Sequence, residues 1–171
     1  MPLSYRQCGN PDLDELVKLA RETYIEAFEA VNDPRDFKTY IDKAFHPKTL
    51  ESELSTAGTS FHFVLEGEDP IGYFKLNTGQ AQTEPQDPEA LELERIYLRA
   101  DKQGRGMGTE MLLEVIRMAR AGNSKYLWLG VWEHNHGAIR LYTRHNFIKF
   151  GQHPYYIGRD KQTDWLMRLD L

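Results

Sequence analysis

The amino-acid sequence predicts an α/β fold, and three features of the chain indicate it. Residues 91–132 contain an apolar run, a glycine-rich turn, an amphipathic helix and a second apolar run, which is the pattern of a strand–helix–strand crossover. Residues 61–77 contain two strand-like runs on either side of a turn-forming stretch, which predicts a hairpin. Residues 12–45 carry apolar side chains at helical spacing, so helices precede that hairpin.

The N-terminal region is predicted to be helical after one short strand at residues 3–8. An asparagine–proline pair then begins a helix over about 12–29. A second stripe of helical spacing covers residues 33–45, and a His–Pro pair ends it. The leucines in residues 50–54 indicate one further short turn or helix.

The predicted hairpin is followed by a long polar segment. Residues 61–65 and 71–77 form the two strands of the hairpin. Residues 78–89 contain two prolines and no periodic apolar set, so we expect a mobile surface loop. Its acidic side chains are expected to be solvated rather than catalytic; these are Glu84, Asp87 and Glu89.

The run 91–98 breaks the side-chain alternation of a regular strand. Leu91 and Leu93 share one parity, whereas Ile96 and Leu98 share the other. In a regular strand these two pairs would point to opposite faces of the sheet. Either both faces of the strand are buried, or one extra residue forms a bulge near residues 94–95.

The remainder of the chain alternates helices with strands. Helical spacing extends from Met107 to about Arg120, and the apolar run 125–132 predicts a central strand. Asn135 is a suitable cap for a second helix. Two final strands are predicted at 147–156 and 163–169.

Residues 103–109, Gln-Gly-Arg-Gly-Met-Gly-Thr, join the irregular strand to the helix that follows it. Three glycines remove Cβ atoms from one short turn, so several backbone N–H groups can converge on a single anion. The helix N-terminus adds partial positive charge, and Arg105 can add a guanidinium. The turn has neither the lysine of a Walker loop nor the third glycine of a dinucleotide fingerprint, whose place Thr109 occupies. A different kind of phosphate cradle and an ordinary flexible loop are the two remaining interpretations.

Length and composition limit the function classes. At 171 residues the chain suits one domain, residues 1–171, with a sizeable core. Cys8 is the only cysteine, which excludes an internal disulfide and fits a reducing cytoplasm. The sequence contains no apolar run long enough to span a membrane and no basic-then-apolar export signal. A net charge of −5 and dispersed basic residues argue against nucleic-acid binding.

Two spaced motifs resemble those of the GNAT superfamily of acetyl-CoA-dependent N-acetyltransferases. The spacing Gln-x-x-Gly-x-Gly at 103–108 resembles the pyrophosphate loop of that superfamily. Residues 135–142 match its Asn-x-x-Ala-x-x-x-Tyr series, although Asn146 stands where members usually have glycine. Asparagine tolerates left-handed backbone, so the departure is mild. The resemblance implies a mixed, mostly antiparallel sheet of about six or seven strands, splayed at a bulge near residues 94–95, with about four flanking helices.

The resemblance also implies which residues bind acetyl-CoA. Superfamily members hold this co-substrate with the backbone of the splayed strand, the glycine loop and the second motif. The residues so implied are Ile96, Tyr97, Leu98, Gln103, Gly104, Arg105, Gly106, Met107, Gly108, Thr109, Asn135, Ala138 and Tyr142. Tyr142 also stands where members place the general acid that protonates the leaving thiolate.

Acetyl transfer to nitrogen requires a group that accepts a proton, because an alkylammonium with a pKa of ~10.4 is not a nucleophile. Glu92 and Glu94 lie on the strand that should pass the thioester, and superfamily members place a basic glutamate at one or other position. Either glutamate is therefore a candidate base. Alternatively, both simply pair with Arg95 or a lysine on a neighbouring strand, and neither is the base.

The identity of the acceptor rests on a narrower likeness. Blocks at 91–98, 128–133 and 162–164 look like those of the PaiA group, whose members are known as spermidine/spermine acetyltransferases. This likeness suggests a polyamine or another small primary amine. Residues that would lie near its amines are Glu92, Trp132 and Tyr155. The alternatives are a protein N-terminus, an amino acid, an amino sugar or an aminoglycoside as acceptor, or a regulatory module that binds acetyl-CoA without catalysis.

No metal ion is expected to take part. His134 and His136 stand close together in sequence, but no third ligand follows at a recognisable spacing. Neither nucleic acid nor membrane is expected as a partner. Dimerisation through the last strands occurs in the superfamily, so the resemblance allows a homodimer.

Overall fold

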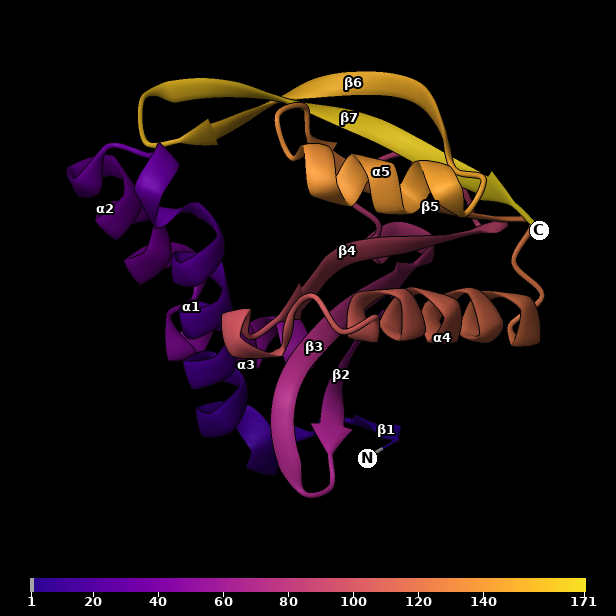
Figure 1. Ribbon diagram of the computed structural model, residues 1–171, viewed down its shortest axis with the longest axis horizontal. Helices are drawn as coiled ribbons and strands as arrows, with labels where there is room; N and C mark the ends of the chain where they lie inside the picture. The colour runs from indigo at the N-terminus through magenta and orange to yellow at the C-terminus, as the bar shows by residue number, and fades with distance from the viewer. Residues whose placement is uncertain (1) are drawn as a thin grey trace.

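The computed structural model describes residues 2–171 and contains a seven-stranded sheet with five α-helices around it (Figure 1). The strands are β1 (Leu3–Gln7), β2 (Thr59–Glu66), β3 (Asp69–Thr78), β4 (Ala90–Leu98), β5 (Tyr126–Trp132), β6 (Ile148–Ile157) and β7 (Asp160–Asp170). The helices are α1 (Leu13–Phe28), α2 (Pro34–Ala44), α3 (Pro47–Leu54), α4 (Met107–Ala121) and α5 (His136–Arg144). The strand order is β1-β2-β3-β4-β5-β7-β6, and within the described residues only β4 and β5 pair in parallel. This mixed, mostly antiparallel sheet confirms the predicted fold class.

Local capping explains why the structure has one α-helix more than the four expected. The Asp33 carboxylate accepts hydrogen bonds from the backbone of Arg35 and Asp36, at 3.0 and 3.1 Å, which starts α2. His46 does the same for α3 through its Nδ1 atom, 3.1 Å from the backbone nitrogen of Lys48. A cap followed by proline at the first helical position therefore makes α3 a helix rather than a turn.

The helices divide between the two faces of the sheet. One hydrophobic cluster joins the sheet to α4 and α5, and it includes Met111, Leu112, Val115 and Tyr142. A second cluster joins the opposite face to α1, α2 and α3, and it includes Leu16, Phe37, Leu50, Phe61 and Tyr73. The strands between them are thus covered on both sides, as an α/β sheet requires.

A bulge in β4 resolves the broken alternation of that strand. Lys75 of β3 pairs with Arg95, whereas the next residue, Leu76, pairs with Leu93, so Glu94 is the extra residue. Because of this extra residue, the leucines before the bulge and the apolar residues after it all pack with the cluster under α4; these are Leu91, Leu93, Ile96 and Leu98. The predicted bulge near residues 94–95 is confirmed.

The two parallel strands, β4 and β5, separate at this bulge. β4 and β5 pair only from Ala90 to Leu93, opposite Tyr126 to Leu129. Beyond that point β5 continues to pair with β7 as far as Trp132, opposite Asp164. The second half of β4 therefore has an open edge towards β5, which we call the splay.

The segment 78–89 is more firmly packed than its polar composition predicts. It begins with a short 3₁₀ turn, and Gln82 is 1% exposed. The Gln82 side chain accepts a hydrogen bond from Nε1 of Trp128 at 2.7 Å. Asp87 accepts another from the Tyr126 hydroxyl at 2.9 Å, and Glu84 lies 2.5 Å from Nδ1 of His153. Its anchors are polar side chains, which a search for periodic apolar residues does not detect.

The β6–β7 hairpin reaches across the molecule to α2 (Figure 1). The Tyr155 hydroxyl lies 3.0 Å from that of Tyr24 and also hydrogen-bonds to Tyr40. Gln162 donates to the side chain of Asn32 at 2.9 Å. These contacts tie the hairpin to α1 and α2. Within residues 2–171, no helix combines the length and the apolar character that crossing a membrane requires.

Candidate functional site

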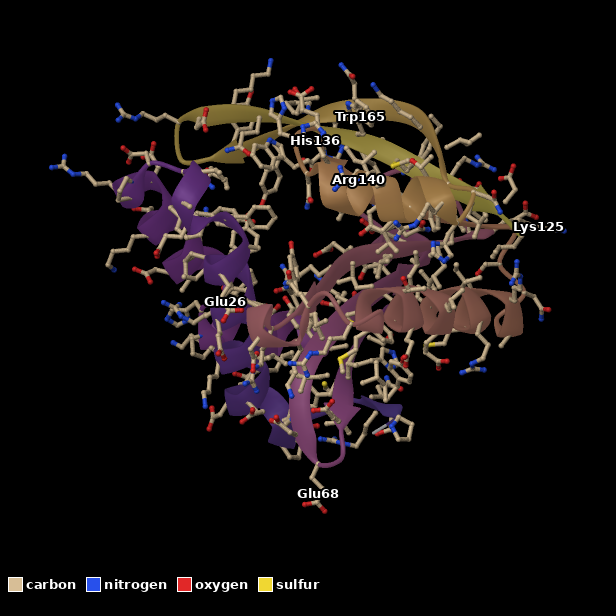
Figure 2. The ribbon with its side chains drawn as sticks, in the orientation of Figure 1. Glu26, Glu68, Lys125, His136, Arg140 and Trp165 are labelled. Carbon is tan, nitrogen blue, oxygen red and sulfur yellow. The ribbon has the colours of Figure 1, made fainter. Side chains whose placement is uncertain are left out.

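The glycine turn at 103–109 is held at both ends and open in between. The backbone nitrogen of Ala100, just before the turn, donates to the carboxylate of Glu26 at 2.8 Å. Figure 2 labels this glutamate, which α1 contributes. Gly104 and Gly106 have φ angles of 80° and 79°, a left-handed conformation that favours glycine. The carbonyl of Gly106 then accepts the bond from Glu110 that begins α4, at 3.1 Å.

The backbone N–H groups of this turn form an anion-binding surface. None of the six N–H groups of residues 104–109 donates a hydrogen bond to an acceptor within residues 2–171. A Cβ atom placed on Gly104, Gly106 or Gly108 would meet no atom within 4 Å. Free donors, an unobstructed approach and a helix N-terminus together fit a diphosphate group.

Two other residues of the turn differ in their freedom to bind a ligand. Gln103 donates its side-chain amide to the carbonyl of Leu98 at 3.0 Å, so this amide ties the turn to the end of β4. Arg105 is exposed and lies beside the free amides in sequence. The guanidinium of Arg105 is therefore available to an anion, whereas the Gln103 amide already has a partner.

The open edge of β4 presents backbone groups of Ile96 and Leu98. The backbone nitrogen of Arg99 donates to Ile71 of β3 at 2.9 Å, and the carbonyl of Tyr97 faces Gly72 so closely that a Cβ there would lie 2.5 Å away. Successive residues of a strand direct their N–H and C=O groups to alternate sides. Ile96 and Leu98 consequently face the splay, whereas the backbone of Tyr97 faces β3.

Tyr142 is held by the capped helix α5. The Asn135 side chain accepts a hydrogen bond from the backbone of Ala138 at 3.3 Å, which caps the helix as predicted. Asn146 takes a left-handed φ of 70° after the helix, and Phe147 then packs against Tyr142 with ring centroids 5.6 Å apart. Tyr142 is 6% exposed, and burial raises the pKa of its hydroxyl. The hydroxyl thus stays protonated and able to donate.

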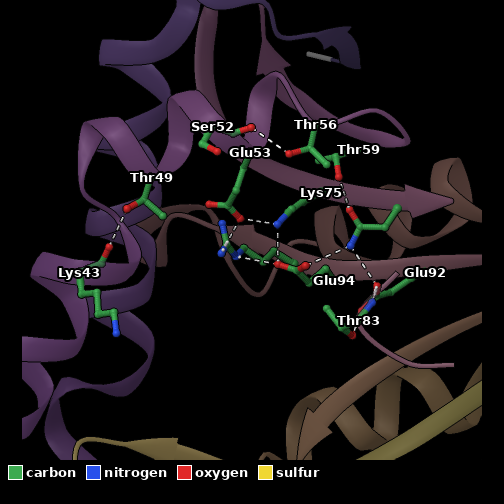
Figure 3. Close-up of polar contacts among 12 residues, drawn as sticks. Lys43, Thr49, Ser52, Glu53, Thr56, Thr59, Lys75, Thr83, Glu92 and Glu94 are labelled. Atoms are coloured by element: carbon green, nitrogen blue, oxygen red, sulfur yellow. Dashed lines mark hydrogen bonds and ion pairs between the residues drawn. The ribbon is translucent and has the colours of Figure 1, made fainter. Parts of the chain in front are cut away.

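Glu92 and Glu94 lie side by side and share one donor, the amide of Asn77 on β3 (Figure 3). The Glu92 carboxylate also accepts from the backbone and the hydroxyl of Thr83, at 2.8 and 2.6 Å. Glu92 is 2% exposed, and burial raises its pKa in spite of these hydrogen bonds. The Glu92 carboxylate is therefore buried and held by three hydrogen bonds.

Glu94 stands on the bulge and faces two cations. Its carboxylate lies 2.8 Å from Nζ of Lys75 and 3.4 Å from Nε of Arg95, and its side chain is 20% exposed. Burial raises the pKa of Glu94, but the charges of Arg95 and Lys75 outweigh burial and hold this pKa below its usual value. Glu94 is therefore ionised at neutral pH and less enclosed than Glu92.

Three aromatic rings lie where β4 and β5 have separated. The Phe28 ring at the end of α1 stands edge-on to Tyr97 of β4 and to Trp132 of β5, with centroids 6.3 and 6.4 Å apart. Trp132 also borders a surface hollow of about 220 Å³. The other residues of that hollow are Val31, Glu133, His134, Asp160, Lys161 and Gln162. Tyr155 instead uses its hydroxyl to tie the hairpin to α1 and α2.

Several residues of the site were not predicted from the sequence. Lys75 and Asn77 share one parity on the otherwise apolar strand β3, a signal that could have identified them. Glu53 of α3 and Phe28 carry no comparable signal, because helical spacing alone does not separate a site residue from a surface or core residue. Within residues 2–171, no group of three His, Cys, Asp or Glu side chains is arranged to hold a metal ion.

Comparisons with known proteins agree with this arrangement. The model of the acetyltransferase (GNAT) family matches residues 13–147. An uncharacterized N-acetyltransferase from Lactobacillus delbrueckii subsp. lactis is 36% identical over 162 residues, covering 95% of this chain and 94% of that protein. Two crystal structures share the fold of this chain, and each comparison covers nearly the whole of both proteins. A PaiA N-acetyltransferase from Thermoplasma acidophilum in complex with coenzyme A gives a TM-score of 0.79 at 18% identity, with 100% of each chain covered. A probable acetyltransferase from Staphylococcus epidermidis gives 0.78 at 14%, with 99% of each chain covered. The chain therefore belongs to the acetyltransferase (GNAT) family.

Proposed function

We propose that this acetyl-CoA-dependent N-acetyltransferase transfers the acetyl group directly to a primary amine of a polyamine such as spermidine or spermine. The observation that carries the proposal is the set of six free backbone N–H groups at 104–109, next to a strand whose open edge begins at Glu94. This arrangement can hold a diphosphate at one end and a thioester at the other.

The co-substrate would lie along the splay. Its diphosphate would bind the amides of 104–109, and its pantetheine arm would bind the backbone groups of Ile96 and the N–H of Leu98, whose carbonyl already accepts from Gln103. Asn135 and Ala138 would border it from α5. A free N–H of β4 could then donate to the thioester oxygen, where negative charge develops during attack.

Glu94 is the base in this proposal. The acceptor nitrogen attacks the thioester carbonyl after its proton passes to Glu94, directly or through a water molecule. Glu94 is favoured over Glu92 because its carboxylate is the more exposed of the two, whereas three hydrogen bonds and burial enclose Glu92. The low pKa of Glu94 makes it a weak base, so a water relay and the orientation of the amine contribute to the rate.

Tyr142 completes the reaction as the general acid. When the tetrahedral intermediate collapses, the C–S bond breaks and coenzyme A leaves as a thiolate, whose conjugate acid has a pKa of about 8.5. Burial keeps the Tyr142 hydroxyl protonated, which supports its role as donor of that proton.

The hollow beside Trp132, where we place the acceptor, is suited to a slender cation. Trp132 offers an aromatic face, and Glu133 and Asp160 bring carboxylates to the same hollow, although Lys161 partly offsets them. Tyr155 ties the hairpin to Tyr24 of α1, and Gln162, which lines this hollow, ties it to Asn32. The fold-level likeness to a PaiA N-acetyltransferase also supports the proposal of a polyamine acceptor.

A panel of amines assayed with acetyl-CoA for release of free thiol tests the proposal. Spermidine and spermine should give a kcat/KM at least ~10-fold above a short peptide with a free N-terminus, an amino acid or an aminoglycoside. A preference for one of those other acceptors would overturn the polyamine assignment alone. Tight binding of acetyl-CoA without turnover of any amine would instead indicate a non-catalytic module.

A further inference from the structure

Glu53 on α3 joins the same group of charges as Glu94, although α3 contributes nothing else to the proposed reaction. Its Oε1 atom accepts from Nζ of Lys75 and lies 3.2 Å from Nη2 of Arg95 (Figure 3). These are the two cations that also face Glu94, at 2.8 and 3.4 Å. Two carboxylates therefore share two cations.

This group of four charges is mostly enclosed. The Lys75 side chain is only 6% exposed, and its Nζ lies 5.5 Å from the ring centroid of Phe61. The Arg95 guanidinium lies 5.2 Å from the ring of Phe45. Because little water screens these charges, each one strongly affects the others.

We propose that Glu53 is a positioning residue for the reaction: it holds Lys75 and Arg95 and so keeps Glu94 basic and free to face the acceptor amine. Without the Glu53 charge, two cations would be balanced at this point by Glu94 alone. Both would then move towards Glu94, stabilise its ionised form and occupy its lone pairs. This inference rests on the proposed function, because it takes Glu94 as the base.

A simple clamp between α3 and the sheet does not explain the arrangement. Three buried polar atoms of this region have no hydrogen-bond partner within residues 2–171: Oε2 of Glu53, Nη1 of Arg95 and the hydroxyl of Tyr73. One carboxylate oxygen of Glu53 is therefore not used to fasten α3 to the sheet. The other neighbours of Glu94 are Glu92 and Asn77, and neither one neutralises the two cations in place of Glu53.

The test is Glu53→Gln, which removes the charge and keeps the size of the side chain. We expect kcat to fall about tenfold and the acid limb of the kcat–pH profile to move about one pH unit lower, with the Kd of acetyl-CoA unchanged. Glu53→Asp, which keeps the charge, should restore much of both. Glu51→Gln is the matched control, because Glu51 is an exposed residue of the same helix.

A second readout does not depend on turnover. Carbon-13 NMR titration of Glu94 in the protein without substrates should show a lower pKa in Glu53→Gln than in the wild type, and a smaller decrease in Glu53→Asp. If Glu53→Gln does not fold, Glu53→Ala, which also removes the charge, carries the test and should show the same decrease. An unchanged Glu94 pKa in the folded variant would overturn the inference.

The outcome can be separated from that of the proposed function. If Glu94→Gln abolishes the acid limb while Glu53→Gln leaves it in place, the role of Glu53 is wrong and the base assignment stands. If Glu94→Gln leaves kcat and its pH profile unchanged, Glu94 is not the base, and the role of Glu53 fails with it.

Discussion

The carboxylates of Glu92 and Glu94 are both hydrogen-bonded to the same nitrogen, Nδ2 of Asn77, at 2.9 and 3.0 Å. Despite this shared donor, their pKa values move in opposite directions. Burial raises the pKa of Glu92. Burial also raises the pKa of Glu94, but the charges of Arg95 and Lys75 outweigh this effect and lower that pKa. Two neighbouring acids of one strand are thus given different protonation behaviour by their surroundings.

Glu92→Gln should show that the protein holds a proton on Glu92 more tightly when folded. The folded pKa of Glu92 lies above the unfolded value of ~4.3, so its favourable contribution is complete below that value and is lost as the pH rises through the folded pKa. The wild type should therefore lose stability relative to Glu92→Gln as the pH rises from 4 to 7. Urea denaturation across this range measures the difference, and a constant difference would contradict the account.

Glu94→Gln should show the opposite dependence. The folded pKa of Glu94 lies below its unfolded value, so its contribution is present above ~4.3 and is lost as the pH falls through the folded pKa. The wild type should be more stable than Glu94→Gln at pH 6, and the difference should shrink towards pH 3. A difference that grows on acidification would refute the ion pairs with Lys75 and Arg95.

Tyr142→Phe should lower kcat by ~10²-fold or more and leave acetyl-CoA affinity nearly intact, because only the proton donor is removed. The ring keeps its packing against Phe147, so the fold should persist. Steady-state kinetics and calorimetric binding separate the two effects. An unchanged kcat would remove Tyr142 from the mechanism.

Gly106→Ala should weaken acetyl-CoA binding at least ~10-fold, because a Cβ would stand on the open face of the amides and the φ of 79° would be strained. Gly79→Ala is the matched control. Gly79 also has a positive φ, of 55°, and an equally open Cβ position, but it lies outside the turn. Equal losses of affinity in both variants would mean that strain, and not access to the amides, is responsible.

Trp132→Ala should raise the KM for a polyamine by ~10-fold through loss of a cation–π contact, without changing the Kd of acetyl-CoA. Tyr156→Ala provides the control, since Tyr156 of β6 is an exposed aromatic residue that does not line the hollow beside Trp132. If both variants raise KM equally, Trp132 does not contact the acceptor.

The parts of this molecule that could be predicted from sequence are those set by local rules. The parity of four residues in one strand indicates either a bulge or burial of both faces, and the family resemblance selects the bulge; the cap at Asn135 and the left-handed Asn146 follow from their own side chains. The left-handed backbone of the glycine turn likewise follows from its residue types, because glycine favours positive φ angles.

The parts that could not be predicted depend on contacts between distant segments. Glu53 lies 22 residues from Lys75 in sequence and meets it only because α3 packs against β2, the strand paired with β3. The buried side chain of Gln82 accepts its hydrogen bond from Trp128, which lies 46 residues away. Such polar anchors have no periodic signal, so the segment 78–89 resembled a free loop.

The most direct measurement is an NMR titration of the ¹⁵N-labelled protein with coenzyme A. We expect the backbone amides of residues 104–109 to show the largest shifts and to saturate together with those of Ile96 and Leu98. If these amides stay unchanged while coenzyme A binds, the diphosphate is held elsewhere and the glycine turn is not its binding site.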